Sequence, residues 1–166
     1  MKLVIISGRS GSGKSSALNM LEDLDFYCID NLPAGLLPAL AKQAIDVDHH
    51  DDHSNVKIAV SIDARNIPTD LSCFPQLMAE IPDVVDTNII YLDANNSTLI
   101  KRFSETRRKH PLSYDKPVIV GIEQERQLIE PVRVLADNAI NTTDMMAKDL
   151  RHHIQQRYGK EDIGLS

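Results

Sequence analysis

The chain has 166 residues, of which 42% are hydrophobic and 25% charged, and 18 basic against 24 acidic side chains give it a net charge of −6. That length corresponds to about one domain with a core of its own. The composition excludes wholesale disorder, and the acidic balance argues against non-specific nucleic-acid binding by the chain as a whole. Two cysteines are too few for a secreted disulfide scaffold, and no signal peptide or membrane-length apolar run is apparent, so a cytoplasmic protein without membrane attachment is expected.

The first half of the chain alternates short apolar runs with helical patterns. Residues 1–7 are aliphatic without polar alternation, which is typical of a strand buried on both faces of a parallel sheet. A glycine-rich turn follows, and the spacing of apolar residues predicts a helix over 14–24. Two more short strands are predicted at 26–29 and 57–62.

Between these two strands the sequence predicts a helix and then a loop. Pro33 suits the start of the helix, and four apolar residues should anchor it: Leu36, Leu37, Leu40 and Ala41. Residues 46–55 have no core pattern and are interpreted as a surface loop. The loop carries a candidate divalent-metal cluster, although loop histidines without scaffold spacing usually bind no metal; its members are His49, His50 and His53 beside Asp51 and Asp52.

The second half continues the alternation. A strand is predicted at 88–92, a helix at 96–107, a helix over 121–137 that is irregular near Pro131, and a weak strand at 139–141. The last helix should cover 143–158, with Thr142 or Thr143 as its cap. Alternating strands and helices predict an α/β sandwich with right-handed crossovers. We expect one domain over 1–158, and a linker or the cut point of a longer chain at 159–166.

The strongest signal is the string GRSGSGKS at residues 8–15, which satisfies the phosphate-loop pattern between a buried strand and a helix. Glycines allow successive N–H groups to point at phosphate oxygens, and the helix start adds its positive dipole. Lys14 should neutralise the outer phosphates and Ser15 should offer a hydroxyl to Mg²⁺. The sequence therefore predicts a nucleoside triphosphate ligand and a kinase-like P-loop NTPase fold, a three-layer sandwich with a mostly parallel five-stranded sheet.

Magnesium also needs a carboxylate, usually through water. Asp63 and Asp93 each end an apolar strand, where ligands of open α/β sheets lie, so either is a candidate, and Asp63 is favoured. Asp30 also ends a strand, and in small-molecule kinases of this architecture that position often faces the phosphoryl acceptor. The plain alternative for each is a loop residue that caps the next helix.

Residues 101–111 form a basic cluster in an otherwise acidic chain. Planar guanidinium groups suit bidentate phosphate capture, so Arg107 and Arg108 are predicted catalytic groups on a segment that closes over the triphosphate. The alternatives are a solvated helix face and a patch that faces a partner.

Four strings together resemble the amino-terminal half of the RapZ-like family of RNase adapter proteins, also called YvcJ/YhbJ-type nucleotide-binding proteins. They are GRSGSGKS at 8–15, FYCIDNLP at 26–33, SIDARN at 61–66 and TRRKHPL at 106–112. The resemblance covers nearly the whole chain, and the second and fourth strings are far more specific than the phosphate loop alone.

The resemblance implies binding of ATP and GTP and weak nucleotide hydrolysis. By that resemblance the ATP segment is Gly8, Arg9, Ser10, Gly11, Ser12, Gly13, Lys14 and Ser15, and the GTP segment is Asp63, Ala64, Arg65 and Asn66. The resemblance also implies that the full-length protein binds RNA and presents it to an endoribonuclease, which tunes amino-sugar synthesis. By the same resemblance, RNA binding and metabolite sensing belong largely to a carboxyl-terminal domain, which is expected to begin where this chain ends.

Three functions remain open at this point. The chain is a regulatory nucleotide-binding domain with slow NTPase activity, a small-molecule kinase with its acceptor near Asp30, or a binding module without turnover. No NKxD-type guanine-reading motif is present, which argues against a GTP-only site. The sequence leaves homo-oligomerisation open.

Overall fold

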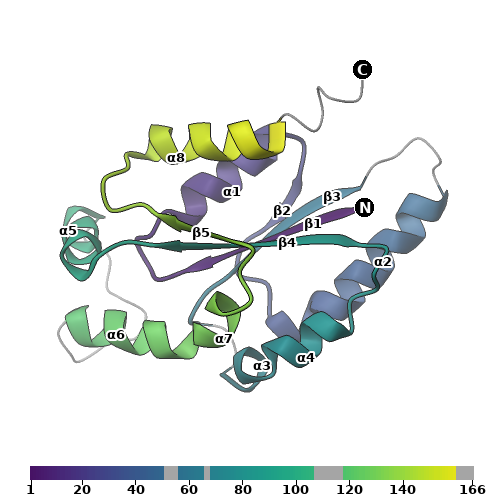
Figure 1. Cartoon of the computed structure of the whole chain (residues 1–166), viewed down its shortest axis with the longest axis horizontal. Helices are drawn as coiled ribbons and strands as arrows, with labels where there is room; N and C mark the ends of the chain where they lie inside the picture. The colour runs from purple at the N-terminus through teal and green to yellow at the C-terminus, as the bar shows by residue number, and fades with distance from the viewer. Residues whose placement is uncertain (51–55, 66–67, 107–117, 160–166) are drawn as a thin grey trace.

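The computed structural model describes residues 1–50, 56–65, 68–106 and 118–159 as a parallel sheet between two layers of helices (Figure 1). The strands are β1 (Lys2–Gly8), β2 (Tyr27–Ile29), β3 (Lys57–Ile62), β4 (Asp86–Asp93) and β5 (Asn138–Asn141). The helices are α1 (Lys14–Asp23), α2 (Leu37–His50), α3 (Pro68–Ser72), α4 (Phe74–Ala79), α5 (Asn96–Thr106), α6 (Val118–Leu128), α7 (Glu130–Arg133) and α8 (Ala147–Ile154). A 3₁₀ turn (Ala34–Leu36) precedes α2, and a π-helical turn (Gln155–Gly159) follows α8.

The sheet has the order β2-β3-β1-β4-β5, and every pairing between these strands is parallel. The expected parallel α/β sandwich is therefore confirmed, and the described sheet is parallel throughout. β1 lies at the centre, where Ile5 pairs with Val60 on one side and Ile89 on the other. A central strand covered on both faces must be apolar on both, which explains its unbroken aliphatic run.

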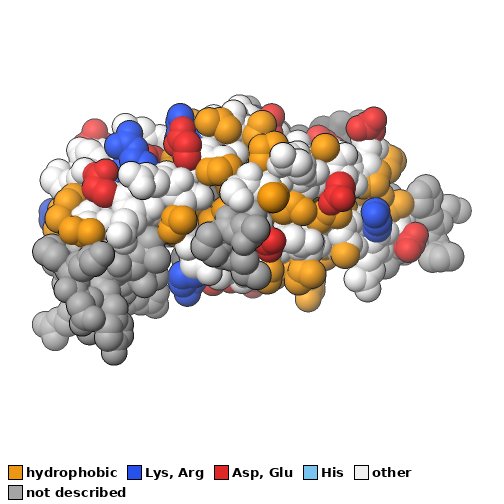
Figure 2. Space-filling view, turned by 90° about the horizontal axis from the view of Figure 1, so that it is seen from below, with side chains coloured by type: hydrophobic (Ala, Val, Ile, Leu, Met, Phe, Trp, Pro, Cys, Tyr) orange, Lys and Arg blue, Asp and Glu red, His pale blue; other side chains and the backbone are white. Residues whose placement is uncertain are grey.

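The two faces of β1 point into separate cores. Leu3 and Ile5 join the core beneath α2, α4 and α7, whereas Val4 and Ile6 join the core beneath α1 and α8. Figure 1 shows these two helical layers on opposite sides of the sheet, with α5 beyond the carboxyl ends of the strands. The face that carries α3, α4, α6 and α7 presents hydrophobic side chains interspersed with charged ones (Figure 2).

The end of the described chain is tied to the sheet through Tyr158. Its hydroxyl donates to Asn88 Oδ1 at 2.5 Å, and its ring lies edge-on to Phe26 with centroids 6.3 Å apart. The last helical segment ends at Gly159, close to the predicted end at 158, although its final turn is π-helical.

Some local predictions were wrong. Residues 46–50 continue α2 instead of forming a loop, and 51–55, with His53, lie outside the described residues. Leu36 is 52% exposed and does not anchor the helix. α8 begins at Ala147, so neither threonine caps it; the Met146 N–H is satisfied by Asp149 instead. α3 and α4 were not predicted, because they are only five and six residues long.

Candidate functional site

The candidate site is the loop between β1 and α1, where the chain turns sharply at the carboxyl end of the central strand. Gly8 has φ 153° and Gly13 has φ 111°, a region that residues with a Cβ rarely adopt. A Cβ on Gly8 would meet the Leu92 carbonyl oxygen at 2.1 Å, and one on Gly13 would meet Leu150 at 2.6 Å. The glycines therefore allow a loop that packs directly against β4 and α8.

The loop delivers an uncapped helix terminus. Gly13 is the N-cap residue of α1 and makes no side-chain capping hydrogen bond, and the first amide that bonds within the helix is that of Ala17, to the Gly13 carbonyl. Uncapped amides at the amino end of a ten-residue helix form an anion site, because they add to the positive end of the helix dipole. The fully buried Ser12 Oγ also has no hydrogen-bond partner among the described residues. These donors fit a phosphate group.

Lys14 is the cation at this terminus. Its ammonium donates to the carbonyl oxygens of Gly8 at 2.8 Å and Arg9 at 3.0 Å, so it folds back over the loop. Burial lowers the Lys14 pKa, while the carboxylates of Glu125, Asp63 and Asp30 raise it and the nearby Arg65 lowers it further. Three acids and one further base therefore lie near enough to Lys14 to act on its charge.

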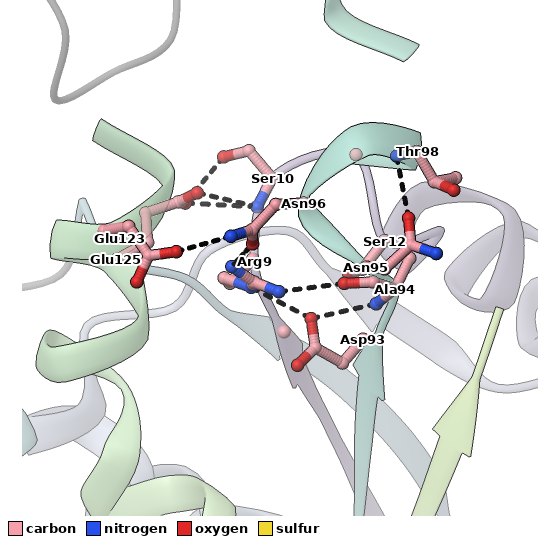
Figure 3. Close-up of polar contacts among 12 residues, drawn as sticks. Arg9, Ser10, Ser12, Asp93, Ala94, Asn95, Asn96, Thr98, Glu123 and Glu125 are labelled. Carbon is pink, nitrogen blue, oxygen red and sulfur yellow. Dashed lines mark hydrogen bonds and ion pairs between the residues drawn. The ribbon is translucent and has the colours of Figure 1, made fainter. Parts of the chain in front are cut away.

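The sequence did not single out Glu125, yet its side chain contacts the loop directly. It lies on α6 and is 1% exposed. Both of its carboxylate oxygens accept from the Ser10 N–H, at 2.9 and 3.1 Å, and Oε2 also accepts from the Ser10 hydroxyl at 2.6 Å (Figure 3). In the sequence Glu125 is one of several charges on a predicted helix, and only the tertiary fold sets it apart.

At the end of β3, Asp63 and Arg65 form a bidentate ion pair. Arg65 donates to Asp63 from Nη2 at 2.6 Å, from Nε at 3.1 and 3.2 Å, and from its backbone N–H at 2.8 Å. Asp63 is buried and Arg65 is exposed, so the guanidinium covers the carboxylate, and this contact raises the Arg65 pKa. Nearby, Asp30 accepts from the Ser61 hydroxyl at 2.6 Å.

Arg9 belongs to the loop, but its side chain turns away from it. The guanidinium is 3% exposed and donates to Asp93 Oδ1, Asn96 Oδ1 and the Ala94 carbonyl at 2.7–2.9 Å (Figure 3). Asp93 is thus the ion-pair partner of Arg9 and also accepts from the Ala94 N–H. The predicted ligand contact of Arg9 is therefore confined to its backbone, and its side chain fixes the loop on β4.

Arg102 ties the loop to the segment after β5. Its guanidinium donates to the Gly11 carbonyl at 2.7 Å, to Thr142 O and Oγ1 at 2.6 and 3.1 Å, and to the Met145 carbonyl at 3.3 Å. The buried Thr142 hydroxyl in turn donates to the Ser12 carbonyl at 2.8 Å. Arg102 and Thr142 thus hold the outer side of the loop, a role that no local sequence signal indicates.

Replacing Arg102 by alanine should lower the free energy of unfolding by about 1–3 kcal/mol, because charge-assisted hydrogen bonds to partly buried carbonyl groups are lost. The neighbouring exposed Lys101 is the matched control, since Lys101→Ala removes the same charge from the same helix. Urea denaturation of the two variants measures the difference. Equal stability would show that the Arg102 contacts contribute nothing to the loop.

Several predicted residues lie outside the described part of the chain. These are Arg107, Arg108 and Asn66, whose predicted roles stay predictions.

The described residues hold no cluster of three or more histidine, cysteine or acidic side chains arranged to bind a metal ion. A phosphate-loop Mg²⁺ does not need one, because nucleotide phosphates and water supply most of its ligands. No helix in the described ranges has the length and apolar character needed to cross a membrane.

Fold and site together define a class. A parallel sheet of this order, with a glycine-rich loop leading from its central strand into an uncapped helix, is a nucleotide-binding P-loop fold of the kinase type. Solved structures share it: a gluconokinase from Sinorhizobium meliloti 1021 has a TM-score of 0.58 at 16% identity, covering 99% of this chain and 95% of its own. A shikimate kinase from Acinetobacter baumannii has 0.57 at 14%, covering 96% and 93%.

Comparison of sequences identifies the family of this chain, which is narrower than the fold class. The model of the RapZ-like N-terminal domain matches residues 1–162, and the chain belongs to this family. A nucleotide-binding protein from Pseudomonas fluorescens SBW25 is 53% identical over 159 residues, which are 95% of this chain and 55% of that protein. One from Hahella chejuensis is 51% identical, covering 95% and 54%. The chain spans about half the length of these relatives, whose names agree with the nucleotide-binding site.

Proposed function

We propose that this domain binds ATP and GTP together with Mg²⁺ and hydrolyses them slowly. The observation that carries the proposal is the uncapped amino terminus of α1, which presents free amides beside the ammonium of Lys14. A helix terminus, a glycine loop and a lysine at one point suit the phosphates of a nucleotide. The nucleotide-binding names of the relatives from two genera support the same ligand class.

For the Mg²⁺ ion, Ser15 and Asp63 are the proposed protein groups. Ser15 is exposed in the first turn of α1, and Asp63 is one of the carboxylates whose charge acts on Lys14, whereas Asp93 is the partner of Arg9. In this role the Arg65 guanidinium would release part of Asp63 to a magnesium-bound water and itself contact the nucleotide.

Asp63→Asn should therefore weaken the magnesium dependence of triphosphate binding and reduce hydrolysis. The amide keeps the size of the side chain and loses the charge that attracts the hydrated ion. Titrating nucleotide at several Mg²⁺ concentrations measures the effect, and Asp93→Asn is the control. If Asp93→Asn gives this phenotype and Asp63→Asn does not, the metal lies beside the other strand.

For a longer protein that contains this domain, as its relatives are longer, we propose the role of an RNase adapter that regulates amino-sugar metabolism, with RNA and the endoribonuclease bound outside this domain. Family membership over residues 1–162 supports this role, and the net charge of −6 argues that RNA is not held by this part. The nucleotide state of the domain would then control the partner.

A small-molecule kinase is the second candidate. Asp30 favours it, because its carboxylate is held by Ser61 at 2.6 Å and acts on the charge of Lys14. A kinase would transfer phosphate to a metabolite faster than to water. A regulator would hydrolyse slowly and change its affinity for a partner with the bound nucleotide.

One experiment separates these functions. ATP, GTP and their diphosphates are titrated into the domain, and the products are analysed in the same samples, with and without candidate hydroxylated acceptors. Binding with slow release of inorganic phosphate supports the proposal, and a phosphorylated acceptor supports the kinase. Binding without any product would leave a module that holds nucleotide without turnover.

A further inference from the structure

A carboxylate of the chain itself lies on the phosphate loop. The Glu125 carboxylate accepts hydrogen bonds from both donors of Ser10, from the N–H at 2.9 and 3.1 Å and from the hydroxyl at 2.6 Å (Figure 3). These donors come from the same loop whose glycines and lysine are arranged for phosphate oxygens. A buried carboxylate on a loop built for anions is a built-in competitor for part of that site.

The position of Lys14 indicates for which part of the phosphate site Glu125 competes. Lys14 is the residue of a phosphate loop that reaches the β- and γ-phosphates. Of the carboxylates that raise the Lys14 pKa, Glu125 acts most strongly, ahead of Asp63 and Asp30. The Ser10 contact and the proximity to Lys14 agree that Glu125 lies at the end of the loop that receives the terminal phosphate.

We propose that Glu125 is a specificity-determining residue that opposes the γ-phosphate and so biases the site towards nucleoside diphosphates. A diphosphate binds with Glu125 still on Ser10, whereas a triphosphate must displace the carboxylate or bear its repulsion. Two anionic groups that need the same donors exclude each other, and the repulsion is strong because Glu125 is buried. This inference rests on the proposed nucleotide binding and is compatible with the slow hydrolysis proposed above.

The test compares ADP with a non-hydrolysable ATP analogue, both with excess Mg²⁺, by isothermal titration calorimetry. In the wild-type domain ADP should bind at least as tightly as the analogue. Glu125→Gln should improve binding of the analogue relative to ADP by about tenfold, which corresponds to about 1.4 kcal/mol. The glutamine keeps an oxygen that accepts from the Ser10 N–H, so the fold should persist, and thermal unfolding checks it.

Glu123→Gln is the matched control. Glu123 lies on the same helix, but its carboxylate accepts from Asn96 Nδ2 at 2.6 Å and not from the loop (Figure 3). The Glu123→Gln substitution removes the same charge and should leave the ratio of the affinities for ADP and the ATP analogue unchanged.

The contrary outcomes are distinct. A wild-type domain that binds the analogue far more tightly than ADP overturns the assignment, even if Glu125→Gln does not fold. So does a Glu125→Gln variant with an unchanged ratio or with selectively weakened analogue binding, which would make Glu125 a group that supports the triphosphate. If the wild type and both variants bind neither nucleotide, the proposed function itself fails.

Discussion

Replacing Lys14 by alanine is expected to reduce the affinity for ATP and GTP by about 10- to 100-fold while the fold stays intact. The Lys14 ammonium donates to the carbonyl oxygens of Gly8 and Arg9 in the same loop, at 2.8 and 3.0 Å. A charge-assisted contact between this ammonium and a phosphate should contribute about 1.5–3 kcal/mol. The substitution removes two hydrogen bonds within the loop and no side chain of either hydrophobic core, so the variant should stay folded.

Calorimetric titration with each triphosphate measures the loss, and circular dichroism checks the fold. Lys42→Ala is the control, because Lys42 is exposed on α2 and its substitution removes the same charge. If Lys14→Ala binds both nucleotides as tightly as the wild type, the phosphate site does not lie on this loop.

Gly8→Ala is expected to have the largest effect on stability, lowering the free energy of unfolding by roughly 2–4 kcal/mol. The new Cβ would lie 2.1 Å from the Leu92 carbonyl oxygen, a backbone atom of β4, which is paired with a strand on both sides. The backbone at φ 153° adds strain. Urea denaturation measures the loss, and nucleotide binding should fall with it.

Gly35→Ala is the matched control for that substitution. Its Cβ would meet the Asp70 carboxylate at 2.9 Å, which is the mobile end of a side chain, and Gly35 has no positive φ. A cost of less than about 1 kcal/mol is expected there. Equal costs at the two positions would mean that the loop tolerates a shift away from β4.

The sequence predicts best those elements that carry strong local signals. The aliphatic run of β1 and the glycine string after it fix a strand, a loop and a helix start within the first 15 residues. The alternation of strands and helices then predicts the parallel sandwich, because parallel neighbours need crossovers and both faces need cover.

The sequence could not predict the contacts that hold the loop in place. Ser10 and Glu125 are 115 residues apart, and Arg9 and Asp93 are 84 apart. Glu125 does not differ in local pattern from other acids in the chain, and the pattern that makes Asp93 a magnesium candidate does not indicate Arg9 as its partner. Only the packing of α6 and β4 against the loop brings the two acids there. The prediction that Thr142 caps a helix is wrong for the same reason, because its hydroxyl donates to the carbonyl oxygen of Ser12, 130 residues away.

The polar stretch after residue 45 shows a different limit. Asp46 and the residues that follow lack an apolar face, which is typical of a loop, yet α2 continues to His50. The hydrophobic period of the sequence therefore ends before the helix does, and periodicity alone does not locate the last turn of a helix.

The central claim is that the amino terminus of α1 binds the phosphates of a nucleotide. The most direct measurement is an amide NMR titration of the domain with Mg²⁺ and ATP, repeated with ADP, in which each backbone N–H is followed separately. The largest shifts are expected at Gly13, Lys14 and Ser15, the uncapped amides, and Lys14→Ala should weaken the response. Saturating nucleotide that leaves these three amides unmoved, or that shifts a different region instead, would contradict the central claim.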